Sequence, residues 1–501
     1  MLRAVSVQRG DHWALRDISL DLNGGGRWAL FGANGSGKTQ FLKLLAGTVW
    51  PTPTGGDRRV YRRGGRVLDL TEAKTRIVYL GAERQDQYAR HGWNLPVRDV
   101  IATGLHRTDL LLSPVTRGER ERVAAALRSC GLVSLAARRF LSLSYGQKRL
   151  VLLARAVVQN ADWLLLDELF NGLDERHRRR VHAILQALRR RGQSWIVAAH
   201  RAADVPAGTT GMLTLAAGRL APPAPFDAGV VEPARTAAGR PRLRTAVASL
   251  CAAGRAPPPA GPATLLRLEH ADLFVDYRPV LRDVNWVLRA GEQWAVTGAN
   301  GAGKTSFLKL LYGDLSPALG GTITRRGCPA GTPIERWKRR TAYLSPELQT
   351  DYLVDVPIED LIISGRHASI GLVDPPSAYD RRIGRRWLRF FELEPLARRR
   401  PRELSYGELR RALMARAMAA NARLLLLDEP LTGLDPGQRD LMRELFERLA
   451  GEGVSIVLAV HHPEDLPRGI THLLHLHKRR AISGALQITD GVGRPARRSP
   501  A

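Results

Sequence analysis

The sequence contains the same short glycine-rich motif twice, and this motif restricts the possible folds more than any other feature. Each copy fits G-x-x-x-x-G-K-[ST], in which backbone N–H groups surround a polyphosphate, the lysine reaches the terminal phosphates and the hydroxyl contacts Mg²⁺. The sequence therefore predicts two nucleotide sites. The first is formed by Gly32, Ala33, Asn34, Gly35, Ser36, Gly37, Lys38 and Thr39, and the second by Gly298, Ala299, Asn300, Gly301, Ala302, Gly303, Lys304 and Thr305.

The segments around each motif predict a strand before it and a helix after it. Residues 28–31 and 294–297 are short apolar runs that end at the first glycine. Apolar residues after each motif are spaced i, i+3, i+4, as on one face of a helix: they are Phe41, Leu44 and Leu45, and Phe307, Leu310 and Leu311. A helix that begins there directs free N–H groups at phosphate. A turn that only joins a strand to a helix is the alternative, but it would need neither the Lys-Thr pair nor a second copy.

Composition excludes several classes of protein. The chain has 501 residues and three cysteines far apart, so neither a disulfide framework nor a cysteine-based metal site is expected. No apolar run of about 18 residues is present, and we expect any work at a membrane to need partner chains. The net charge of +28 permits a polyanionic partner such as nucleic acid, the ribosome or acidic lipid. Its arginines are scattered in pairs and triplets, which favours solvated faces and ion pairs.

The chain is a tandem repeat. Residues 41–45, Phe-Leu-Lys-Leu-Leu, recur identically as residues 307–311. Alternating strand-like and helix-like segments in each half predict an α/β fold with a mainly parallel sheet. We expect a first domain over residues 1–220, a linker rich in Pro, Ala and Gly over 221–263, a second domain over 264–485 and a flexible tail over 486–501.

Two apolar runs end abruptly in a pair of carboxylates, Asp167-Glu168 and Asp428-Glu429. Runs of this kind are typical of strands buried on both faces, and ligands collect where such strands end. We expect Asp167 and Asp428, with the hydroxyls of Thr39 and Thr305, to hold Mg²⁺. Glu168 and Glu429 are the candidates to orient and polarise the water that attacks a γ-phosphate. A solvated strand end is the alternative.

Three further patterns complete the candidate sites. Ser144 with Gly146, and Ser405 with Gly407, precede helix-like segments and could face an anion, although a single copy would read as an ordinary N-cap. His200 and His461 follow strand-like segments and are candidate γ-phosphate sensors; a satisfied core histidine is the alternative. His472, His475 and His477 alternate as on one strand face, and we do not expect a metal site there.

These motifs, in this order, resemble those of the ATP-binding cassette (ABC) ATPases: Walker A, signature, Walker B with its glutamate, D-loop and switch histidine. The D-loops would be Gly172-Leu-Asp174 and Gly433-Leu-Asp435. The resemblance implies two tandem P-loop NTPase domains, each with an antiparallel β subdomain and a helical subdomain. The second half is similar to duplicated ATP-binding proteins of the molybdate-transport type, on Ile363-Ser-Gly365 and His461-His-Pro-Glu-Asp465 among other stretches.

The resemblance also implies that the halves pair within one chain around two ATP molecules. Lys38, Thr39, Asp167, Glu168 and His200 would face Ser405 and Gly407 across one ATP, and the second-half counterparts would face Ser144 and Gly146 across the other. Tyr277 would stack on adenine in the second half. Departures from the family pattern are Tyr145 and Tyr406 inside the signatures, and Glu83 and Glu347 where the family has glutamine.

Two main hypotheses for the function follow. The first is an ATP-hydrolysing, energy-coupling subunit that drives membrane permease partners from the cytoplasmic side, for molybdate or another small solute, with docking through residues 95–139 and 357–402. The second is a tandem ABC ATPase that acts on the ribosome or nucleic acid. The Pro-rich segment between the halves favours the first. A regulatory or repair-associated ATPase is a third alternative.

Overall fold

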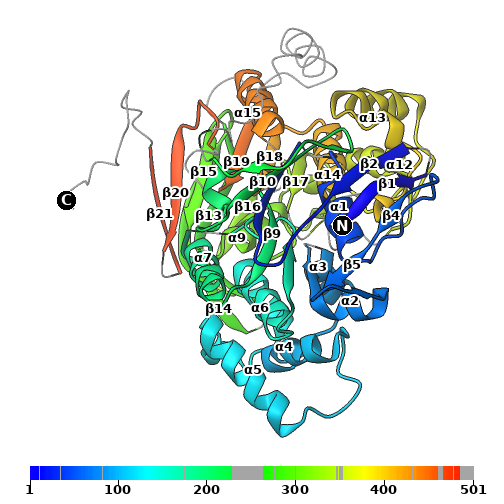
Figure 1. The fold of residues 1–501 in the computed structure, drawn as a ribbon. Coiled ribbons are helices and arrows are strands. Elements are labelled where there is room, and N and C mark those ends of the chain that lie inside the picture. The colour runs from blue at the N-terminus through cyan, green and yellow to red at the C-terminus, as the bar shows by residue number, and fades with distance from the viewer. Residues whose placement is uncertain are drawn as a thin grey trace. The chain divides into compact units, whose positions relative to one another are not determined.

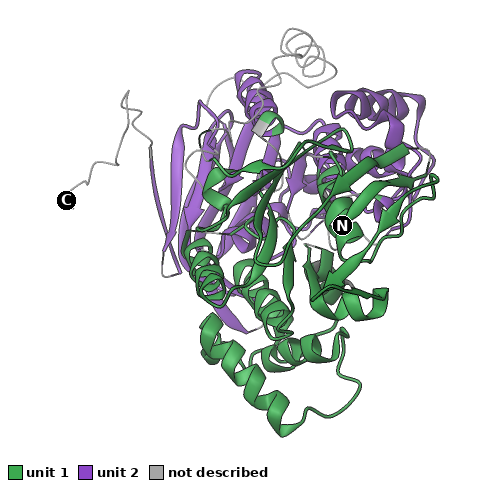
Figure 2. Ribbon diagram, in the orientation of Figure 1, with its two compact units in different colours: residues 1–237, 404–410, 432–438 green, residues 238–403, 411–431, 439–501 purple. Residues whose placement is uncertain are grey.

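The structure is a computed structural model, and it divides into two compact units that we describe separately (Figure 2). One unit comprises residues 1–237, 404–410 and 432–438, and the other comprises residues 238–403, 411–431 and 439–501. The structure describes all residues except 11, 34, 82, 174, 200, 228, 230–262, 276, 300, 346–347, 349–353, 405, 432–433, 435, 461–465, 478 and 486–501.

The first half is built on a sheet with the strand order β11-β10-β3-β9-β8-β7, of which Figure 1 labels β9 and β10. Strands β10, β3, β9, β8 and β7 are parallel, while β11 and the short β12 pair antiparallel with β10. Its strands are β3 (Arg27–Phe31), β7 (Ile77–Leu80), β8 (Trp163–Leu166), β9 (Ser194–Ala198), β10 (Gly211–Ala216), β11 (Arg219–Leu220) and β12 (Ala224–Pro225).

Both faces of this parallel sheet are covered, which explains why its strands are mostly apolar. Successive side chains of β8 point to opposite faces. Leu165 joins the core beneath the antiparallel sheet, whereas Leu164 and Leu166 join the core beneath the helices. Ile196 on β9 follows the same alternation between its neighbours Trp195 and Val197. The catalytic candidates at the ends of these strands therefore sit on a rigid, fully buried base.

Among the described residues, an antiparallel sheet of order β2-β1-β4, a hairpin, seven α-helices and three short 3₁₀ helices complete the first half. The additional strands are β1 (Leu2–Arg9), β2 (His12–Leu20), β4 (Arg58–Arg59), β5 (Tyr61–Arg63) and β6 (Arg66–Leu68). The helices are α1 (Lys38–Leu45), α2 (Leu70–Arg76), α3 (Glu83–Arg90), α4 (Val97–His106), α5 (Arg117–Cys130), α6 (Tyr145–Val157) and α7 (Glu175–Arg190).

The second half repeats this plan, with a sheet of order β17-β18-β19-β15-β20-β21 and an antiparallel sheet of order β14-β13-β16. Its strands are β13 (Thr264–Val275), β14 (Arg278–Arg289), β15 (Gln293–Gly298), β16 (Thr322–Arg325), β17 (Thr341–Leu344), β18 (Leu424–Asp428), β19 (Ser455–Ala459), β20 (His472–His477) and β21 (Arg480–Ala485). Its helices are α9 (Lys304–Tyr312), α10 (Glu335–Lys338), α12 (Ile358–Ser364), α13 (Ala378–Phe390), α14 (Tyr406–Ala419) and α15 (Pro436–Gly451).

The predicted fold class is confirmed: each half has a mainly parallel sheet, an antiparallel sheet and helices. The strands before and the helices after both glycine motifs lie where the sequence indicates. The prediction of three histidines on one strand face was wrong for His472: His475 and His477 share the exposed face of β20, whereas His472 falls on the opposite face and stacks on Trp294. Ordered structure in the first half extends past residue 220, because β12 pairs with β10. The domain boundaries themselves stay predictions, since most of the expected linker and all of the expected tail lie outside the described residues.

Candidate nucleotide sites

The two phosphate loops have nearly the same backbone conformation. Gly37 and Gly303 cap helices α1 and α9 with φ of 101° and 99°, and Gly35 and Gly301 have φ of 78° and 79°. These positive values are readily adopted only by glycine. At Gly37 a side chain is also excluded by space, because a Cβ there would lie 2.5 Å from the carbonyl oxygen of Ala14. The glycines are therefore required by the geometry of the loop.

The lysine of each motif is buried and lies across its own loop. Lys38 Nζ donates to the carbonyl oxygens of Gly32 at 2.8 Å and Ala33 at 3.0 Å. Lys304 Nζ makes the same contacts, to Gly298 at 2.8 Å and to Ala299 at 3.3 Å. Each ammonium group is thus held at the mouth of the loop, where phosphate oxygens would be its partners.

The threonine of each motif contacts the first carboxylate of the same half. Thr39 Oγ1 donates to Asp167 Oδ2 at 2.8 Å, and Thr305 Oγ1 donates to Asp428 Oδ2 at 2.6 Å. The parallel sheet explains this contact, because the loop after β3 and the end of β8 lie on the same edge of the sheet. Residues that are 128 positions apart in the first half are therefore brought into one site.

The oxygen ligands fit Mg²⁺. Asp167 is buried, its Oδ1 has no hydrogen-bond partner among the described residues, and hydroxyl and carboxylate oxygens are ligands that Mg²⁺ prefers. Burial, followed by the negative charge of Glu168, raises the pKa of Asp167 to about 6. Hydrogen bonds from Thr39 and Tyr79 act in the opposite direction. A cation would relieve the cost of this buried carboxylate.

Glu168 and Glu429 share an unusual backbone conformation. Their φ angles are 51° and 49°, in the left-handed region that non-glycine residues rarely adopt. The Glu168 carboxylate accepts a hydrogen bond from Asn171 Nδ2 at 3.0 Å. Backbone strain of this kind is concentrated at functional sites.

The first signature segment forms the start of a helix. Ser144 caps α6: its Oγ accepts from Gln147 N at 3.3 Å, and its N–H donates to Gln147 Oε1 at 3.1 Å. Gly146 has no room for a side chain, because a Cβ would lie 2.7 Å from Cγ of His177. Tyr145, which replaces the family's glycine, packs against Gly172 of the D-loop. Gly407 lies in α14 and is half-buried.

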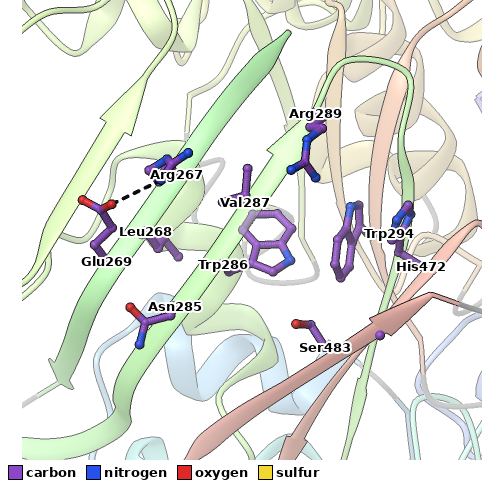
Figure 3. A pocket seen from close by; sticks show the side chains of 11 residues that line it. Arg267, Leu268, Glu269, Asn285, Trp286, Val287, Arg289, Trp294, His472 and Ser483 are labelled. Carbon is purple, nitrogen blue, oxygen red and sulfur yellow. Dashed lines mark hydrogen bonds and ion pairs between the residues drawn. The ribbon is translucent and has the colours of Figure 1, made fainter. Parts of the chain in front are cut away.

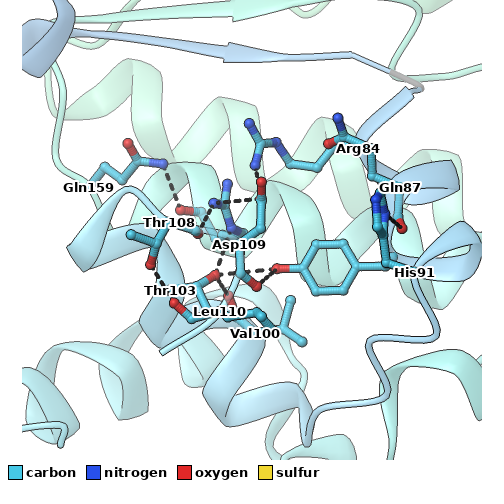
Figure 4. Close-up of polar contacts among 11 residues, drawn as sticks. Arg84, Gln87, His91, Val100, Thr103, Thr108, Asp109, Leu110 and Gln159 are labelled. Carbon is cyan, nitrogen blue, oxygen red and sulfur yellow. Dashed lines mark hydrogen bonds and ion pairs between the residues drawn. The ribbon is translucent and has the colours of Figure 1, made fainter. Parts of the chain in front are cut away.

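A buried arginine, Arg155, ties the signature helix α6 to α4 and to the loop after α4. Figure 4 shows its partners Thr103 and Thr108, with Asp109 and Arg84 nearby. Arg155 Nε donates to Thr103 Oγ1 at 2.9 Å, and Arg155 Nη2 donates to the carbonyl oxygen of Thr108 at 2.6 Å. Asp109 in the same loop pairs with Arg84 on α3. The second half repeats the core of this arrangement, because Arg416 contacts Ser364 Oγ at 3.2 Å and the carbonyl oxygen of Ser369 at 2.8 Å.

For several of the predicted site residues, the structure shows no contact with the nucleotide sites. Asn34, His200, Asn300, Ser405 and His461 lie outside the described residues, as do Asp174, Gly433, Asp435 and Glu347. Tyr277 lies at the turn between β13 and β14, and its side chain is fully exposed. Glu83 is described and pairs with Lys43 Nζ at 2.7 Å. The roles proposed for these residues stay predictions.

Sequence reasoning missed Tyr79, whose hydroxyl donates to Asp167 Oδ2 at 3.0 Å. A repeat in the sequence could have indicated it: the pair Tyr-Leu ends β7 and recurs, with Tyr343, at the end of β17. Sequence reasoning also missed Arg155 and Arg416, which were hidden among many scattered arginines. In the described part of the chain, no helix combines the length and apolar character needed to cross a bilayer.

Comparison with known proteins supports the same assignment. Residues 15–171 and 281–432 match the ABC transporter family. The ABC transporter ATP-binding protein ModF of Escherichia coli K12 is 31% identical over 477 residues, which cover 91% of this chain and 92% of ModF. The ribose import ATP-binding protein RbsA 1 of Rubrobacter xylanophilus is 29% identical, over 89% of this chain and 86% of its own.

A solved structure with a similar fold is the model of ribosome-bound archaeal Pelota and ABCE1. Its matching chain gives a TM-score of 0.62 at 18% identity, over 94% of this chain and 76% of that chain. At this identity the likeness concerns the fold alone. Since the matched segments fall in both halves and ModF is similar over nearly the whole chain, the protein belongs to the ABC transporter family, as a tandem ABC ATPase with two cassettes.

Proposed function

We propose that this protein binds two Mg·ATP molecules, hydrolyses ATP and drives a membrane transport partner. The observation that carries the nucleotide part is the repeated contact between the loop threonine and the strand-end aspartate, Thr39 with Asp167 and Thr305 with Asp428. Both halves keep every residue of this arrangement, which a degenerate, purely structural cassette would not need.

Each described residue has a defined task in this reaction. The loop N–H groups and the lysine bind the phosphates, and Lys38 would exchange its two carbonyl partners for phosphate oxygens. Thr39 and Asp167 would hold Mg²⁺, which neutralises charge on the β- and γ-phosphates when bound. Glu168 orients the attacking water and accepts its proton. Lys304, Thr305, Asp428 and Glu429 act in the same way in the second half.

We propose further that the signature of one half completes the ATP site of the other. Ser144 and Gly146 stand at the N-terminus of α6, where free N–H groups favour an anion. Ser405 and Gly407 would have the same task for the first site, and His200 and His461 would contact the γ-phosphate. This pairing would let ATP binding close the two halves and hydrolysis reopen them.

The transport part rests on similarity and on one surface feature. ModF and RbsA 1 are ATP-binding proteins of transport systems by name. In addition, both halves expose an apolar side chain at the same place, in the loop before the α5 or α13 helix: Leu112 is 81% exposed and Val373 is 89% exposed. By contrast, Trp387, Phe390 and Phe391 are buried, so they belong to the helical core and not to a docking surface.

Hydrolysis is tested with the double variant Glu168→Gln, Glu429→Gln. We expect phosphate release to fall by at least about a hundredfold, since general-base catalysis contributes about 10²–10⁴, while ATP stays bound. The double variant Glu121→Gln, Glu394→Gln changes two exposed glutamates, one in α5 and one in a short 3₁₀ helix, and serves as the matched control. Undiminished turnover in the first variant would refute the role of these glutamates.

The partner is tested by ATP-dependent copurification from solubilised membranes. We expect the double variant Leu112→Asp, Val373→Asp to lose an integral-membrane partner while its ATP hydrolysis in isolation is unchanged. Association with ribosomes, equal in both proteins, would instead favour the alternative of a tandem ABC ATPase that acts on the ribosome, and it would place the protein away from the inner face of the membrane.

A further inference from the structure

The first unit contains a cavity of about 550 Å³ at the edge of the parallel sheet opposite the phosphate loop. Its lining includes Ile77, Trp163 and Ser194, which are the first residues of β7, β8 and β9. The phosphate loop follows the last residue of β3 instead. Since these strands are parallel, the cavity and the nucleotide site lie at opposite ends of the sheet, and the cavity is no part of that site.

Two of the residues that line the cavity are smaller than their counterparts in the second half. Leu20 and Ala73 line it in the first half, at positions where the second half has Trp286 and Trp337. Both tryptophans are buried, 4% exposed each, and belong to the hydrophobic core of the second unit. Trp286 packs edge-on against Trp294 and Phe307, and Figure 3 shows it beside Trp294. The first half therefore lacks two indole groups that are buried in the core of the second.

A tyrosine takes over the polar contact of the missing indole without filling its volume. Trp337 Nε1 donates to the carbonyl oxygen of Leu311 at 2.9 Å, near the end of α9. In the first half, Tyr61 OH from the β5–β6 hairpin donates to the carbonyl oxygen of Leu45, at the end of α1, also at 2.9 Å. The hydrogen bond is kept, and the space beneath it is left open.

The lining combines apolar walls with an arginine-rich rim. Leu22, Leu45, Ile77 and Trp163 are only partly buried although they pack against the core. The rim includes Arg62, Arg63, Arg76 and Arg191 together with one acid, Asp162, which pairs with Arg63 at 3.2 Å. Among the described residues, Arg62, Arg76 and Arg191 have no carboxylate within 4.0 Å. The volume lies within the range of about 300–1,000 Å³ typical of ligand pockets.

We propose that this cavity binds a small amphipathic anion, with its apolar body against the leucine, isoleucine and tryptophan walls and a carboxylate or phosphate headgroup at the arginine rim. The apolar walls supply affinity through burial of hydrocarbon, and Arg76, a half-buried arginine of the rim, supplies a charge-assisted hydrogen bond to the headgroup. The proposal concerns the first unit alone and does not depend on hydrolysis of ATP.

The headgroup is tested by calorimetric titration of the full chain, without nucleotide, with decanoate, decyl phosphate and decanol. We expect saturable binding of at least one of the two anions. Decanol should bind at least about tenfold more weakly, because it lacks the charge-assisted contact of the headgroup. The stronger anion identifies the headgroup. Equal affinity for decanol and both anions, or no saturable binding of any probe, would overturn the proposal.

Two variants locate the site. Ala73→Trp introduces the indole of the second half and should abolish binding, while nucleotide binding is retained as evidence of an intact fold. Arg76→Gln should weaken the anion about tenfold, whereas the control Arg58→Gln, an exposed arginine outside the lining, should leave its affinity unchanged. Should Ala73→Trp fail to fold, Arg76→Gln decides: an affinity equal to that of Arg58→Gln refutes the site.

Discussion

The hydroxyl of Tyr79 donates to Oδ2 of Asp167 at 3.0 Å, the same oxygen that accepts a hydrogen bond from Thr39 at 2.8 Å. Both donors stabilise the ionised carboxylate, whereas burial and the charge of Glu168 destabilise it. The balance leaves the pKa of Asp167 at about 6, above the value of about 3.9 expected in the unfolded chain. The Mg²⁺ candidate of the first site is thus a carboxylate whose charge is costly until a cation arrives.

This pKa predicts how stability depends on pH in the absence of Mg²⁺ and nucleotide. Between pH 4 and 6 the folded state binds more protons than the unfolded state, so the contribution of Asp167 to the free energy of unfolding falls as pH rises through this window. Asp167→Asn removes that dependence. We therefore compare the free energy of unfolding of the variant with that of the wild type at each pH by calorimetric unfolding. Between pH 5 and pH 7 this difference should shift by about 1 kcal/mol in favour of the variant.

Tyr79→Phe removes one of the two hydrogen bonds that favour the ionised carboxylate. We expect the pKa of Asp167 to rise further, so that the decline of stability continues to a higher pH than in the wild type. Tyr88→Phe is the control, since Tyr88 is buried in the same unit but contacts Thr103 and the carbonyl oxygen of Asp109. The same pH dependence in both variants would show that Tyr79 does not affect Asp167.

Local sequence patterns predicted the parts of the site that depend on neighbouring residues. Glycines at fixed spacing gave the loop conformation at Gly37 and Gly303, and apolar runs gave the strands that end at Asp167 and Asp428. The cavity beside Ala73 was not predictable in this way, because it depends on the volumes of residues brought together from distant segments. No local pattern reports that the summed volume of Leu20 and Ala73 leaves a space.

Gly146 is predicted to be required for packing and not only for binding an anion. A Cβ at this position would lie 2.7 Å from the His177 ring, so Gly146→Ala must displace His177 or the start of α6. We expect a loss of about 1–3 kcal/mol in the free energy of unfolding, as for other overpacked sites. Gly118→Ala is closely matched: Gly118 is also the second residue of a helix, and a Cβ there meets nothing within 4 Å.

That control should be neutral or stabilising by up to about 1 kcal/mol, because alanine favours the helix more than glycine does. The comparison is made by the midpoint of chemical unfolding of the two variants. If Gly146→Ala is as stable as Gly118→Ala, then the close approach of α6 and α7 is not a constraint on this position.

Because Glu168 has a left-handed backbone conformation, we expect glycine at this position to be more stabilising than alanine, which is the reverse of their order inside a helix. Both Glu168→Gly and Glu168→Ala lose the carboxylate, but only glycine adopts a φ near 51° without strain. We expect the glycine variant to be more stable by about 1 kcal/mol. At Glu121, an exposed position within α5, the order should reverse, since glycine weakens a helix by about 0.5–1 kcal/mol relative to alanine.

The two nucleotide sites are predicted to differ in affinity. Tyr277 is fully exposed and free to stack on adenine in the second half, whereas its register partner in the first half is Asp11. Stacking of a base on an aromatic ring contributes about 1–3 kcal/mol. Lys304→Ala should therefore lower the affinity for a fluorescent ATP analogue, measured by titration, more than Lys38→Ala does, because it removes the tighter site. In a Tyr277→Ala background this difference should vanish, and equal losses in both single variants would show that Tyr277 contributes nothing to the second site.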